Sequence, residues 1–328
     1  MSAALRLFVL CVTAALVAAA PAAAADPNPW REARTWNIAH QGGEDEFPSN
    51  TLYAFKQALR AGADMLELDV GVTRDDQVVV MHDTTLDRTT SGTGTIASHT
   101  LRQIRRLDGA YWFSRHGEHY GHDKRRSAYV FRGIATGQRR PPRGFRRSDF
   151  RVPTLRQVLR AFPRTPINVE IKGRTKAEGI EEYLQNARVL ARLLNGQPRR
   201  DIVVVSFKQP AVDLFHQLAP SFPVAPGIDG SATFLLGGGA PGEGVVAFQL
   251  PITYVLNGTK LDVTTPGNVA RAHAAGYAWH TWFGNDDADA PSTWRTLISW
   301  CVDGVMTARP RAFERTLRAT PSPPSCAS

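Results

Sequence analysis

The chain has 328 residues, of which 43% are hydrophobic, and its 39 lysines and arginines outnumber 30 acidic residues, which gives a formal charge of +9. This composition can bury a sizeable core, so it excludes a largely disordered chain and fits one large domain or two small ones. The positive charge indicates phosphates, anionic lipid surfaces or nucleic acid as partners, and it fits a basic composition that only serves solubility equally well.

The first 25 residues have the pattern of a cleavable secretory signal peptide. Arg6 supplies the positive charge, Leu7 to Val17 form the apolar stretch, and Ala23-Ala24-Ala25 forms the cleavage site. We therefore expect a secreted chain in which residues 26–320 form one domain and residues 321–328 form a flexible tail. No later apolar stretch reaches the ~18–20 residues that a membrane-spanning helix needs, so we expect no transmembrane segment.

Strand-like and helix-like segments then alternate along the chain. Apolar runs predict strands at residues 35–40, 65–70, 78–82, 167–171, 202–206, around 224, 245–249, 277–282 and 304–307. Helical spacing of apolar residues predicts helices at 51–61, 101–107, 154–161, 176–194, 210–218 and 266–275. Repeated alternation of this kind predicts a parallel α/β fold.

Polar residues at the ends of several predicted strands favour a closed (β/α)8 barrel, because such barrels place their sites at the carboxyl ends of different strands. An open doubly wound sheet would instead gather its ligand residues at one switch point. The nine predicted strands are one too many for eight barrel positions. Since the link from Val70 to Val78 is too short for a crossover of ~10 residues, one of those two strands is irregular or lies outside the barrel.

Residues 108–151 interrupt the alternation and are rich in arginine, glycine, histidine and aromatic residues. We predict a long insertion here, between the third strand region and the barrel units that follow, which serves as a loop or a lid. The glycines among His116, His119 and His122 argue against a second metal site on one helix face. The arginines from 139 to 151 form a solvated loop or attract phosphodiesters and anionic polymers.

Two cysteines remain after removal of the predicted signal peptide. Cys301 and Cys326 pair in one interpretation, because secretion places the chain in an oxidising compartment, and the disulfide then ties the tail to the body. In the other interpretation Cys301 is buried and Cys326 is a free thiol in the tail. The sequence supports both equally.

Carboxylates and histidines lie at the ends of neighbouring predicted strands. Glu67 and Asp69 are two residues apart in one strand, so their side chains project to the same side. His40 and His82 end the strands before and after it, and Glu170-Ile171-Lys172 repeats the pattern and adds a cation. Because buried carboxylates are costly unless they are paired or bind metal, the pattern predicts a hard-metal site beside an acid–base pair.

An ordered set of motifs between about residues 35 and 310 resembles the glycerophosphodiester phosphodiesterase family. The motifs are His40-Gln41-Gly42, Pro48-Ser49-Asn50-Thr51, Gly62-Ala63-Asp64, Glu67-Leu68-Asp69-Val70, His82-Asp83, Leu86-Asp87-Arg88-Thr89-Thr90, Gly92-Thr93-Gly94, Pro153-Thr154-Leu155, Glu170-Ile171-Lys172, Trp282 with Asn285-Asp286, and Asp303-Gly304-Val305-Met306-Thr307. The block from His40 to Gly94 is the specific part. The resemblance implies a barrel enzyme that hydrolyses glycerophosphodiesters to glycerol 3-phosphate and an alcohol.

The resemblance also implies residue roles. His40 and His82 would be the general acid–base pair, for which histidine is suited by its ordinary pKa of ~6.5. Glu67, Asp69 and Glu170 would hold one divalent cation, and a set of oxygen ligands without cysteine favours Mg²⁺ or Ca²⁺ over zinc. A glycerol hydroxyl would attack the phosphorus, and a cyclic phosphate would then be hydrolysed with the roles of the histidines reversed.

Three further residues would face the substrate. Lys172 would offset negative charge that develops on the phosphate, with an ordinary salt bridge as the alternative. Trp282 would form a wall against the glycerol or alcohol group or else belong to the core. Gln41 would contact the phosphate, at a position where the family usually has arginine.

The chain departs from the family pattern at three more positions. Ser49 replaces the usual glutamate of the P-E-N-T motif, Phe283 replaces a threonine, and Ala308 replaces an aspartate. The missing guanidinium at position 41 is expected to lower activity or change the substrate. The sequence Glu44-Asp45-Glu46 adds an acidic cluster to the same loop, either for a hydroxyl contact or as a solvated turn.

Three functions remain open at this point. The first is a secreted, metal-dependent hydrolase of small phosphodiesters, with an anionic surface as a further contact. The second is a phospholipase D-like or C-like enzyme that acts on intact lipid or lysolipid, which exposure of Trp112, Phe113, Phe131 and Phe145 would favour. The third is a non-catalytic binding protein on the same fold. No specific nucleic-acid partner is expected, because no recognition motif accompanies the charge.

Overall fold

The computed structural model describes residues 28–31, 34–256, 258–284 and 287–327. The predicted signal peptide and the Asn285-Asp286 motif lie outside these residues. Every helix within the described ranges is too short or too polar to cross a membrane.

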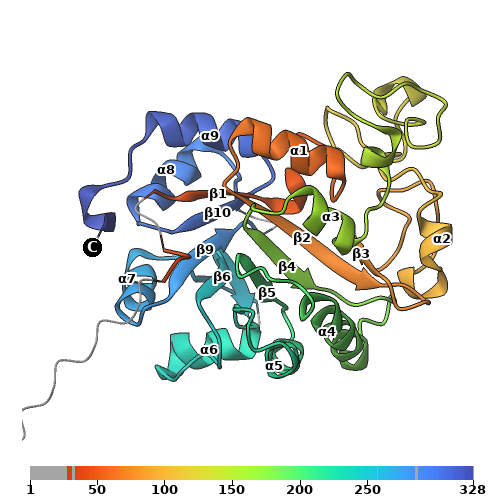
Figure 1. Cartoon of the computed structure of the whole chain (residues 1–328). Coiled ribbons are helices and arrows are strands. Elements are labelled where there is room, and N and C mark those ends of the chain that lie inside the picture. Colours follow the sequence, from red (N-terminus) through yellow and green to blue (C-terminus); the bar gives the residue numbers. More distant parts are fainter. Residues whose placement is uncertain (1–27, 32–33, 257, 285–286, 328) are drawn as a thin grey trace, which may run out of the picture.

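Parallel strands form a barrel whose order follows the chain (Figure 1). Hydrogen bonds join neighbouring strands in the order β5-β4-β2-β1-β10-β9-β6. Val224 completes the ring with parallel bridges to Val204 in β5 and to Val245 just before β6. The predicted (β/α)8 barrel is therefore confirmed. The strands are β1 (Trp36–Ala39), β2 (Met65–Val72), β4 (Ile167–Ile171), β5 (Ile202–Val205), β6 (Ala247–Pro251), β9 (Ala278–Trp282) and β10 (Gly304–Thr307).

The predicted strand at residues 78–82 lies outside the barrel, which accounts for the one strand too many. β3 (Val78–Val80) pairs with β2 in the antiparallel direction, with Val80 opposite Val70, so the two strands form a hairpin. The backbone N–H of Met81 then donates to the carbonyl oxygen of Asp69 at 2.9 Å. Because the chain reverses after β2, it carries the residues that follow β3 back toward the level of Asp69.

A helix follows each of the eight barrel positions and covers its outer face. These helices are α1 (Leu52–Ala61), α3 (Leu155–Ala161), α4 (Ile180–Leu194), α5 (Gln209–Leu218), α6 (Ile228–Gly237), α7 (Pro266–Ala274), α8 (Pro291–Ser299) and α9 (Pro310–Ala319). The short α2 (Leu101–Ile104) and the hairpin of β7 (Thr253–Leu256) and β8 (Thr259–Asp262) lie outside this pattern. Local chemistry sets the ends: the Thr51 hydroxyl caps α1 by accepting from the N–H of Ala54, and Gly62 ends it with a φ of 102°.

The sequence analysis did not predict α6, β7, β8, α8 or α9. α8 and α9 both begin with a proline in their first turn, which is a usable start signal. α6 offers no such signal, because its sequence IDGSATFLLG contains glycines and a serine and has no polar face.

The interior of the barrel is apolar at one end and polar at the other. Trp30, Ile38, Met65, Val203 and Ala278 belong to one buried cluster that fills it. Above this cluster, the side chains of Asn168 and Gln249 exchange two hydrogen bonds of 2.9 and 3.1 Å across the interior. The charged residues lie beyond them, towards the carboxyl ends of the strands.

Residues 108–151 fold against the barrel and have an aromatic core of their own, on the right-hand side of Figure 1. Phe131 and Phe150 pack on Tyr53 of α1, with ring centroids 4.9 and 4.6 Å apart. Two single turns of 3-10 helix, Arg126–Ala128 and Arg147–Phe150, are the regular elements of this segment. The insertion thus packs on α1, the helix that follows the loop carrying His40.

The two cysteines among the described residues are bonded to each other. Cys301 and Cys326 form a disulfide, which selects one of the two alternatives that the sequence left open. Residues Pro324–Ala327 form a turn of 3-10 helix. The tail that we predicted to be flexible is therefore attached to the body of the barrel beside α8.

Candidate active site

Three carboxylates converge at the carboxyl ends of two neighbouring strands. β2 provides Glu67 and Asp69, and β4 provides Glu170, which lies opposite Asp69 in the parallel register. One oxygen of each residue lies within 4.8 Å of those of the other two. Glu67 is 2% exposed, Asp69 0% and Glu170 9%, so three potential negative charges share one buried space.

Hydrogen bonds and one ammonium group hold these carboxylates. The backbone N–H of Gln41 donates to Glu67 at 2.8 Å, and the side-chain amide of Asn50 donates to Asp69 at 3.0 Å. The Lys172 ammonium lies 2.8 Å from Glu170 and 3.5 Å from Asp69. Lys172 thereby carries the one described ammonium or guanidinium group that is paired with the three acids.

The pKa values of the three acids reflect this crowding. Burial raises the pKa of Glu67 well above its ordinary value, and the charge of Asp69 adds to the effect. Burial also raises the pKa of Glu170, against the opposing charge of Lys172. Burial would raise the pKa of Asp69 as well, but His82 and Lys172 outweigh it and hold the pKa below its usual range. The fold therefore concentrates more negative charge than its own cations neutralise.

The donor set fits a hard divalent cation. All three side chains offer carboxylate oxygens, which Mg²⁺ and Ca²⁺ prefer. One oxygen of Asp69 is buried without a hydrogen bond, and it lies 3.5 Å from the Lys172 ammonium. Unpaired buried carboxylates are costly, so a cation at this place would satisfy the oxygens that the protein leaves open.

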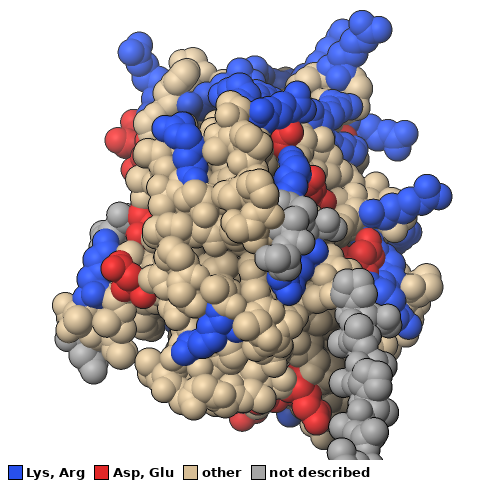
Figure 2. All heavy atoms as spheres, turned by 90° about the vertical axis from the view of Figure 1, so that its left-hand side faces the viewer, with Lys and Arg blue, Asp and Glu red and all other residues tan. Residues whose placement is uncertain are grey.

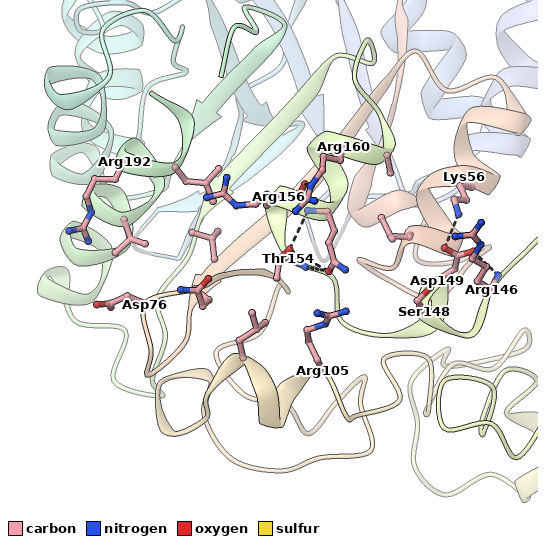
Figure 3. A pocket seen from close by; sticks show the side chains of 18 of the residues that line it. Lys56, Asp76, Arg105, Arg146, Ser148, Asp149, Thr154, Arg156, Arg160 and Arg192 are labelled. Atoms are coloured by element: carbon pink, nitrogen blue, oxygen red, sulfur yellow. Dashed lines mark hydrogen bonds and ion pairs between the residues drawn. The ribbon is translucent and has the colours of Figure 1, made fainter. Parts of the chain in front are cut away.

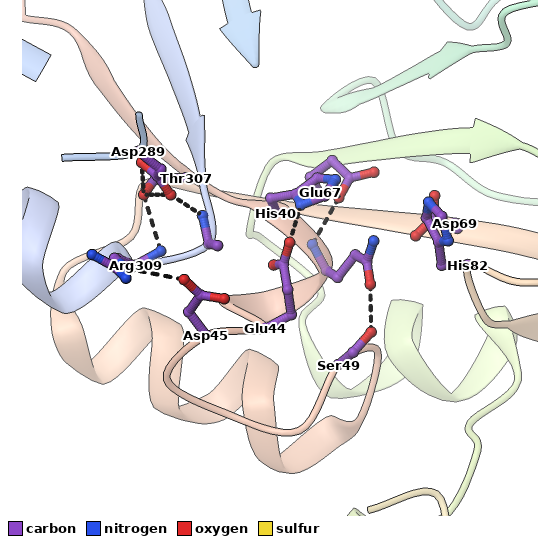
Figure 4. A network of polar contacts seen from close by, with 12 residues as sticks. His40, Glu44, Asp45, Ser49, Glu67, Asp69, His82, Asp289, Thr307 and Arg309 are labelled. Atoms are coloured by element: carbon purple, nitrogen blue, oxygen red, sulfur yellow. Dashed lines mark hydrogen bonds and ion pairs between the residues drawn. The ribbon is translucent and has the colours of Figure 1, made fainter. Parts of the chain in front are cut away.

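His40 lies on one side of the acidic cluster (Figure 4). It follows β1, and its Nδ1 is paired with the carboxylate of Glu44 on the same loop. Its Nε2 points toward Glu67, 3.9 Å from the carboxylate oxygen. Burial would lower the pKa of His40, but Glu44, Glu67 and Asp69 outweigh it and raise the pKa to about 10.

His82 lies on the other side of the cluster, beside Asp69 (Figure 4). Its Nδ1 is 2.8 Å from the carboxylate of Asp83, the next residue. Arg88 binds the same carboxylate through two N–H groups, at 2.6 and 2.9 Å. Burial alone would raise the pKa of Asp83, but His82 and Arg88 hold it below its usual range. Each histidine thus has one nitrogen engaged with a carboxylate and the other free for chemistry.

The two departures at positions 41 and 49 contact each other. The Ser49 hydroxyl donates to the side-chain oxygen of Gln41 at 2.5 Å, and both residues are buried. The family pattern has an arginine and a glutamate at these positions. In this chain, the two positions are occupied by a neutral, hydrogen-bonded pair of buried side chains.

Asn50 and Tyr120 belong to the site although the sequence analysis gave them no role in it. Asn50 has a φ of 55° and donates its amide to Asp69, which the P-x-N-T motif indicated without giving the partner. Tyr120 comes from the insertion, and its hydroxyl accepts from the backbone N–H of Ser49 at 2.6 Å. The ring of Tyr120 also lies under the guanidinium of Arg88, at 5.0 Å. No periodic pattern or motif in the insertion indicated this contact.

The three acids Glu44, Asp45 and Glu46, on the loop after β1, each bind a different part of the protein. Glu44 binds His40, as described above, and Asp45 binds Arg309 at 3.0 Å. Glu46 caps α9 by accepting from the backbone N–H groups of Arg311 and Ala312, at 3.0 and 3.2 Å. The three acids are therefore not a solvated turn, while the second carboxylate oxygen of Glu44 is buried without a hydrogen bond and stays open to a substrate hydroxyl.

The carboxylate of Asp289, in the loop between β9 and α8, holds the segment that follows β10. Asp289 accepts from the Thr307 hydroxyl and from the N–H of Ala308, each at 2.9 Å, and from the Trp294 indole at 2.6 Å (Figure 4). Burial raises the pKa of Asp289 to about 6. Asp289 thus supplies a carboxylate beside position 308, where the family's aspartate is missing.

Trp282 ends β9 at the same mouth of the barrel. Its indole N–H donates to the carbonyl oxygen of Gln249 at 3.2 Å, and its ring meets Phe207 edge to face at 5.6 Å. Phe207 is 39% exposed and lies 5.3 Å from the Lys172 ammonium. These two rings form an apolar edge beside the charged cluster.

The histidines of the insertion do not form a second cluster of ligands. His119 binds the carbonyl oxygen of Ser114 at 2.8 Å, and His122 stacks on Trp112 with centroids 3.9 Å apart. Among the described residues, Glu67, Asp69 and Glu170 form the one group of three potential ligands.

The sequence matches the glycerophosphoryl diester phosphodiesterase family over residues 40–312. It is 28% identical over 285 residues to a glycerophosphodiester phosphodiesterase of Bacillus subtilis (strain 168), over 86% of each chain. It is 34% identical over 180 residues to that of Caldanaerobacter subterraneus subsp. tengcongensis, over 52% of this chain and 62% of the relative. Over 73 residues, 22% of each chain, it is 51% identical to glycerophosphodiester phosphodiesterase 1 of Homo sapiens.

Solved structures share the fold. A phosphodiesterase of Oleispira antarctica in complex with the product sn-glycerol-3-phosphate superposes with a TM-score of 0.60 at 19% identity, over 86% of this chain and 96% of the other. A glycerophosphodiester phosphodiesterase of Agrobacterium tumefaciens gives a TM-score of 0.57 at 23% identity, over 85% and 99%. The chain thus belongs to the glycerophosphoryl diester phosphodiesterase family, whose members hydrolyse phosphodiesters on a (β/α)8 barrel.

Proposed function

We propose that the chain is a secreted, metal-dependent enzyme that cleaves glycerophosphodiesters to glycerol 3-phosphate and an alcohol by two-histidine acid–base catalysis. The observation that carries the proposal is the arrangement of His40 and His82 on either side of one buried acidic cluster. The family supports the reaction class. The relative from Oleispira antarctica, which holds sn-glycerol-3-phosphate as its product, supports the glycerol half of the substrate.

Glu67, Asp69 and Glu170 would hold one Ca²⁺ or Mg²⁺ ion, and the fit of their oxygens to a hard cation supports this assignment. When bound, such an ion supplies positive charge to a phosphoryl oxygen. Asn50 fixes the orientation of Asp69 and the N–H of Gln41 fixes that of Glu67, so the ligands are held before the cation arrives.

The two histidines would transfer the protons of the reaction. One accepts the proton of a glycerol hydroxyl as that oxygen attacks the phosphorus, and the other protonates the leaving alcohol. The cyclic phosphate that results is hydrolysed with the two roles exchanged. The carboxylates of Glu44 and Asp83 hold Nδ1 of each ring, which leaves Nε2 as the nitrogen that exchanges protons.

Other side chains would bind and position the substrate. Lys172 is close enough to the acidic cluster to face the same phosphate, and its charge would stabilise the pentavalent transition state. Trp282 and Phe207 would contact the alcohol or the glycerol carbons. The Gln41 side chain is held by Ser49 and would offer its amide N–H groups where the family offers a guanidinium.

Secretion is supported by the signal-like first 25 residues and by the disulfide between Cys301 and Cys326, since such bonds persist in oxidising compartments. The measurement is direct: the N-terminal sequence and mass of the protein recovered from the medium of the producing cells. Retention of the full chain inside the cell would contradict this part of the proposal.

Small soluble diesters are favoured over intact lipid by the insertion. Phe113 is 0% exposed and Phe131 4%, so two of the four aromatic residues that would dock on a lipid surface belong to the core of the insertion, while Trp112 and Phe145 are half-buried. One observation favours a lysolipid as second candidate. The β7–β8 hairpin follows β6 beside Trp282 and exposes Tyr254, Val255, Leu256 and Leu261.

The test is a panel of glycerophosphocholine, glycerophosphoethanolamine and lysophosphatidylcholine, each assayed with Ca²⁺, with Mg²⁺ and after chelation. We expect hydrolysis of the soluble diesters that chelation abolishes and that one of the two ions restores. Hydrolysis that prefers lysophosphatidylcholine, and that falls when Val255 and Leu256 are changed to serine, would favour the second candidate. Binding without turnover of any of these compounds would instead leave a binding protein on the same fold.

A further inference from the structure

A groove on the outside of the barrel is lined by more positive than negative side chains. It has a volume of about 1130 Å³ and runs past α3 and α4, between the turn before β3 and the insertion (Figure 3). Its charged residues are six cations and two acids, namely Lys56, Arg105, Arg146, Arg156, Arg160, Arg192, Asp76 and Asp149. No residue of the candidate active site lines it. We refer to it as the arginine groove.

The acids of the arginine groove leave most of its cations unneutralised. Asp149 already accepts from the Lys56 ammonium at 2.7 Å and from the backbone N–H of Arg146 at 2.9 Å. Asp76 accepts from Gln185 at 3.4 Å. Within the described part of the chain, no salt bridge forms at Arg105, Arg156 or Arg192. Guanidinium groups that share a groove and have no acid paired with them repel each other, so an anion bound there gains from all of them.

The cations follow the length of the arginine groove. Figure 3 shows Arg192 of α4 at one end, Arg156 and Arg160 of α3 in the middle, and Lys56 with Arg146 at the other end. Arg105, directly after α2, points toward α3 from the opposite wall. A single phosphate would meet one or two of these groups, whereas a chain of phosphates would meet several in succession. Arginine suits phosphate because its planar fork donates two parallel hydrogen bonds.

The lining and the shape of the groove disfavour single-stranded nucleic acid and a membrane surface. No aromatic side chain is among the described residues that line the groove, so bases of single-stranded nucleic acid would find no stacking partner. A groove recessed between two helices and the insertion also matches a narrow chain better than it matches the flat surface of a bilayer. We propose that the arginine groove is a second binding site, separate from the catalytic centre, for an extended anion with repeated phosphate groups.

The test measures binding of inorganic phosphate, tripolyphosphate and long-chain polyphosphate to the mature protein by calorimetry. The buffer contains no divalent cation, because polyphosphate itself binds such ions. We expect affinity to rise with chain length, and we expect the triple variant Arg105→Gln, Arg156→Gln, Arg192→Gln to lower the affinity for the long chain about tenfold or more. The slope of log K against log salt should also decrease by about one for each phosphate contact that is lost.

The matched control removes the same charge elsewhere. Figure 2 shows that lysines and arginines also gather along the upper edge of another face, where Figure 1 places α9 and α1. The triple variant Arg295→Gln, Arg315→Gln, Arg318→Gln on α8 and α9 should therefore change affinity by less than about twofold if the groove is the site. Diester hydrolysis shows that both triple variants are folded. If the groove variant does not fold, the salt slopes of Arg156→Gln and Arg192→Gln alone replace it.

Three outcomes would overturn the proposal. Equal loss of affinity in both triple variants would mean that only the diffuse charge of the protein attracts polyphosphate. Affinity that is the same for inorganic phosphate and for the long chain would mean a site for a single anion. Binding to vesicles of phosphatidylglycerol and phosphatidylcholine that depends on the groove and exceeds binding to polyphosphate would mean a membrane surface.

Discussion

The two histidines of the candidate site have different surroundings although both bind a carboxylate through Nδ1. The carboxylate behind His40 belongs to Glu44, which has no other described cationic partner. The carboxylate behind His82 belongs to Asp83, which is also bound twice by Arg88. Glu44 therefore acts on the charge of His40, and its effect adds to that of Glu67 and Asp69. Asp83 binds both an imidazole and a guanidinium.

The comparison shows that a carboxylate behind a histidine can set orientation and charge separately. At His40 it does both, because His40 is the one cation that forms an ion pair with Glu44 among the described residues. At His82 the carboxylate of Asp83 also binds Arg88 twice, so it orients the ring while it serves a second cation. Acid–base catalysis with two histidines needs one ring protonated and one neutral at the start. The raised pKa of His40 marks it as the ring that is protonated at the start in protein free of the cation.

The largest effect is expected from removal of either imidazole. His40→Ala and His82→Ala should each lower kcat/KM by about 10²- to 10⁴-fold, because each loses one proton-transfer group. The double variant should be little worse than either single one, since the two act as a unit. His99→Ala is the control, as it removes a partly buried histidine that binds only its own loop. A residual activity close to wild type in either single variant would remove that histidine from the mechanism.

The carboxylates behind the rings should affect charge differently. In protein free of divalent cation, Glu44→Gln should lower the pKa of His40 from about 10, because the imidazolium loses its nearest anion. In this variant, His40 therefore loses its proton at a lower pH than in the wild type. Asp83→Asn should leave the pKa of His40 nearly unchanged. NMR titration of the His40 ring measures both, and equal shifts in the two variants would contradict the difference that we describe.

The neutral pair beside His40 predicts a coupling. Gln41→Arg alone removes the acceptor of the Ser49 hydroxyl and places a larger side chain at a buried position, which should lower the free energy of unfolding by about 1–3 kcal/mol. Adding Ser49→Glu should recover about 0.5–1 kcal/mol of this loss, because the new carboxylate can pair with the guanidinium at the contact that Ser49 and Gln41 now make. Chemical denaturation of the wild type, the two single variants and the double variant closes the cycle. Strict additivity would show that the two side chains are not energetically coupled.

The smallest effect is expected from the contact of the insertion with the His82 side. Tyr120→Phe leaves the backbone N–H of Ser49 without its acceptor, which should cost about 1 kcal/mol of stability. The Ser49-Asn50 turn should loosen, so kcat/KM should fall a few-fold through Asn50 and Asp69. Tyr129→Phe is the control, since its hydroxyl binds only within the insertion. It should lower stability without changing kcat/KM.

The sequence indicated the acidic cluster for a simple physical reason. The period of a strand is two residues, so Glu67 and Asp69 had to share a face, and the parallel register then placed Glu170 beside Asp69. The link after Val70 is likewise too short for a crossover helix, so the strand that follows could not be the next parallel strand of the barrel. Both inferences use only local geometry, and the structure confirms both arrangements.

Other features depend on contacts that no local pattern carries. Val224 closes the barrel through isolated bridges, which a short apolar segment does not distinguish from a loop. Tyr120 reaches Ser49 from an irregular segment, and Asp289 reaches Ala308 from a different loop. Glu44, Asp45 and Glu46 looked like one acidic cluster, yet each has a different partner, because a turn points successive side chains in different directions. These pairings follow from tertiary packing alone.

The hairpin of β2 and β3 has a consequence for the order in which the chain becomes competent. Because β3 returns directly after β2, both histidines, Asn50 and two of the three acids belong to one short early part of the sequence. Glu170 and Lys172 arrive only with β4, after the whole insertion has been synthesised. The three ligands of the proposed cation site are therefore complete only after β4 has been synthesised and has paired with β2.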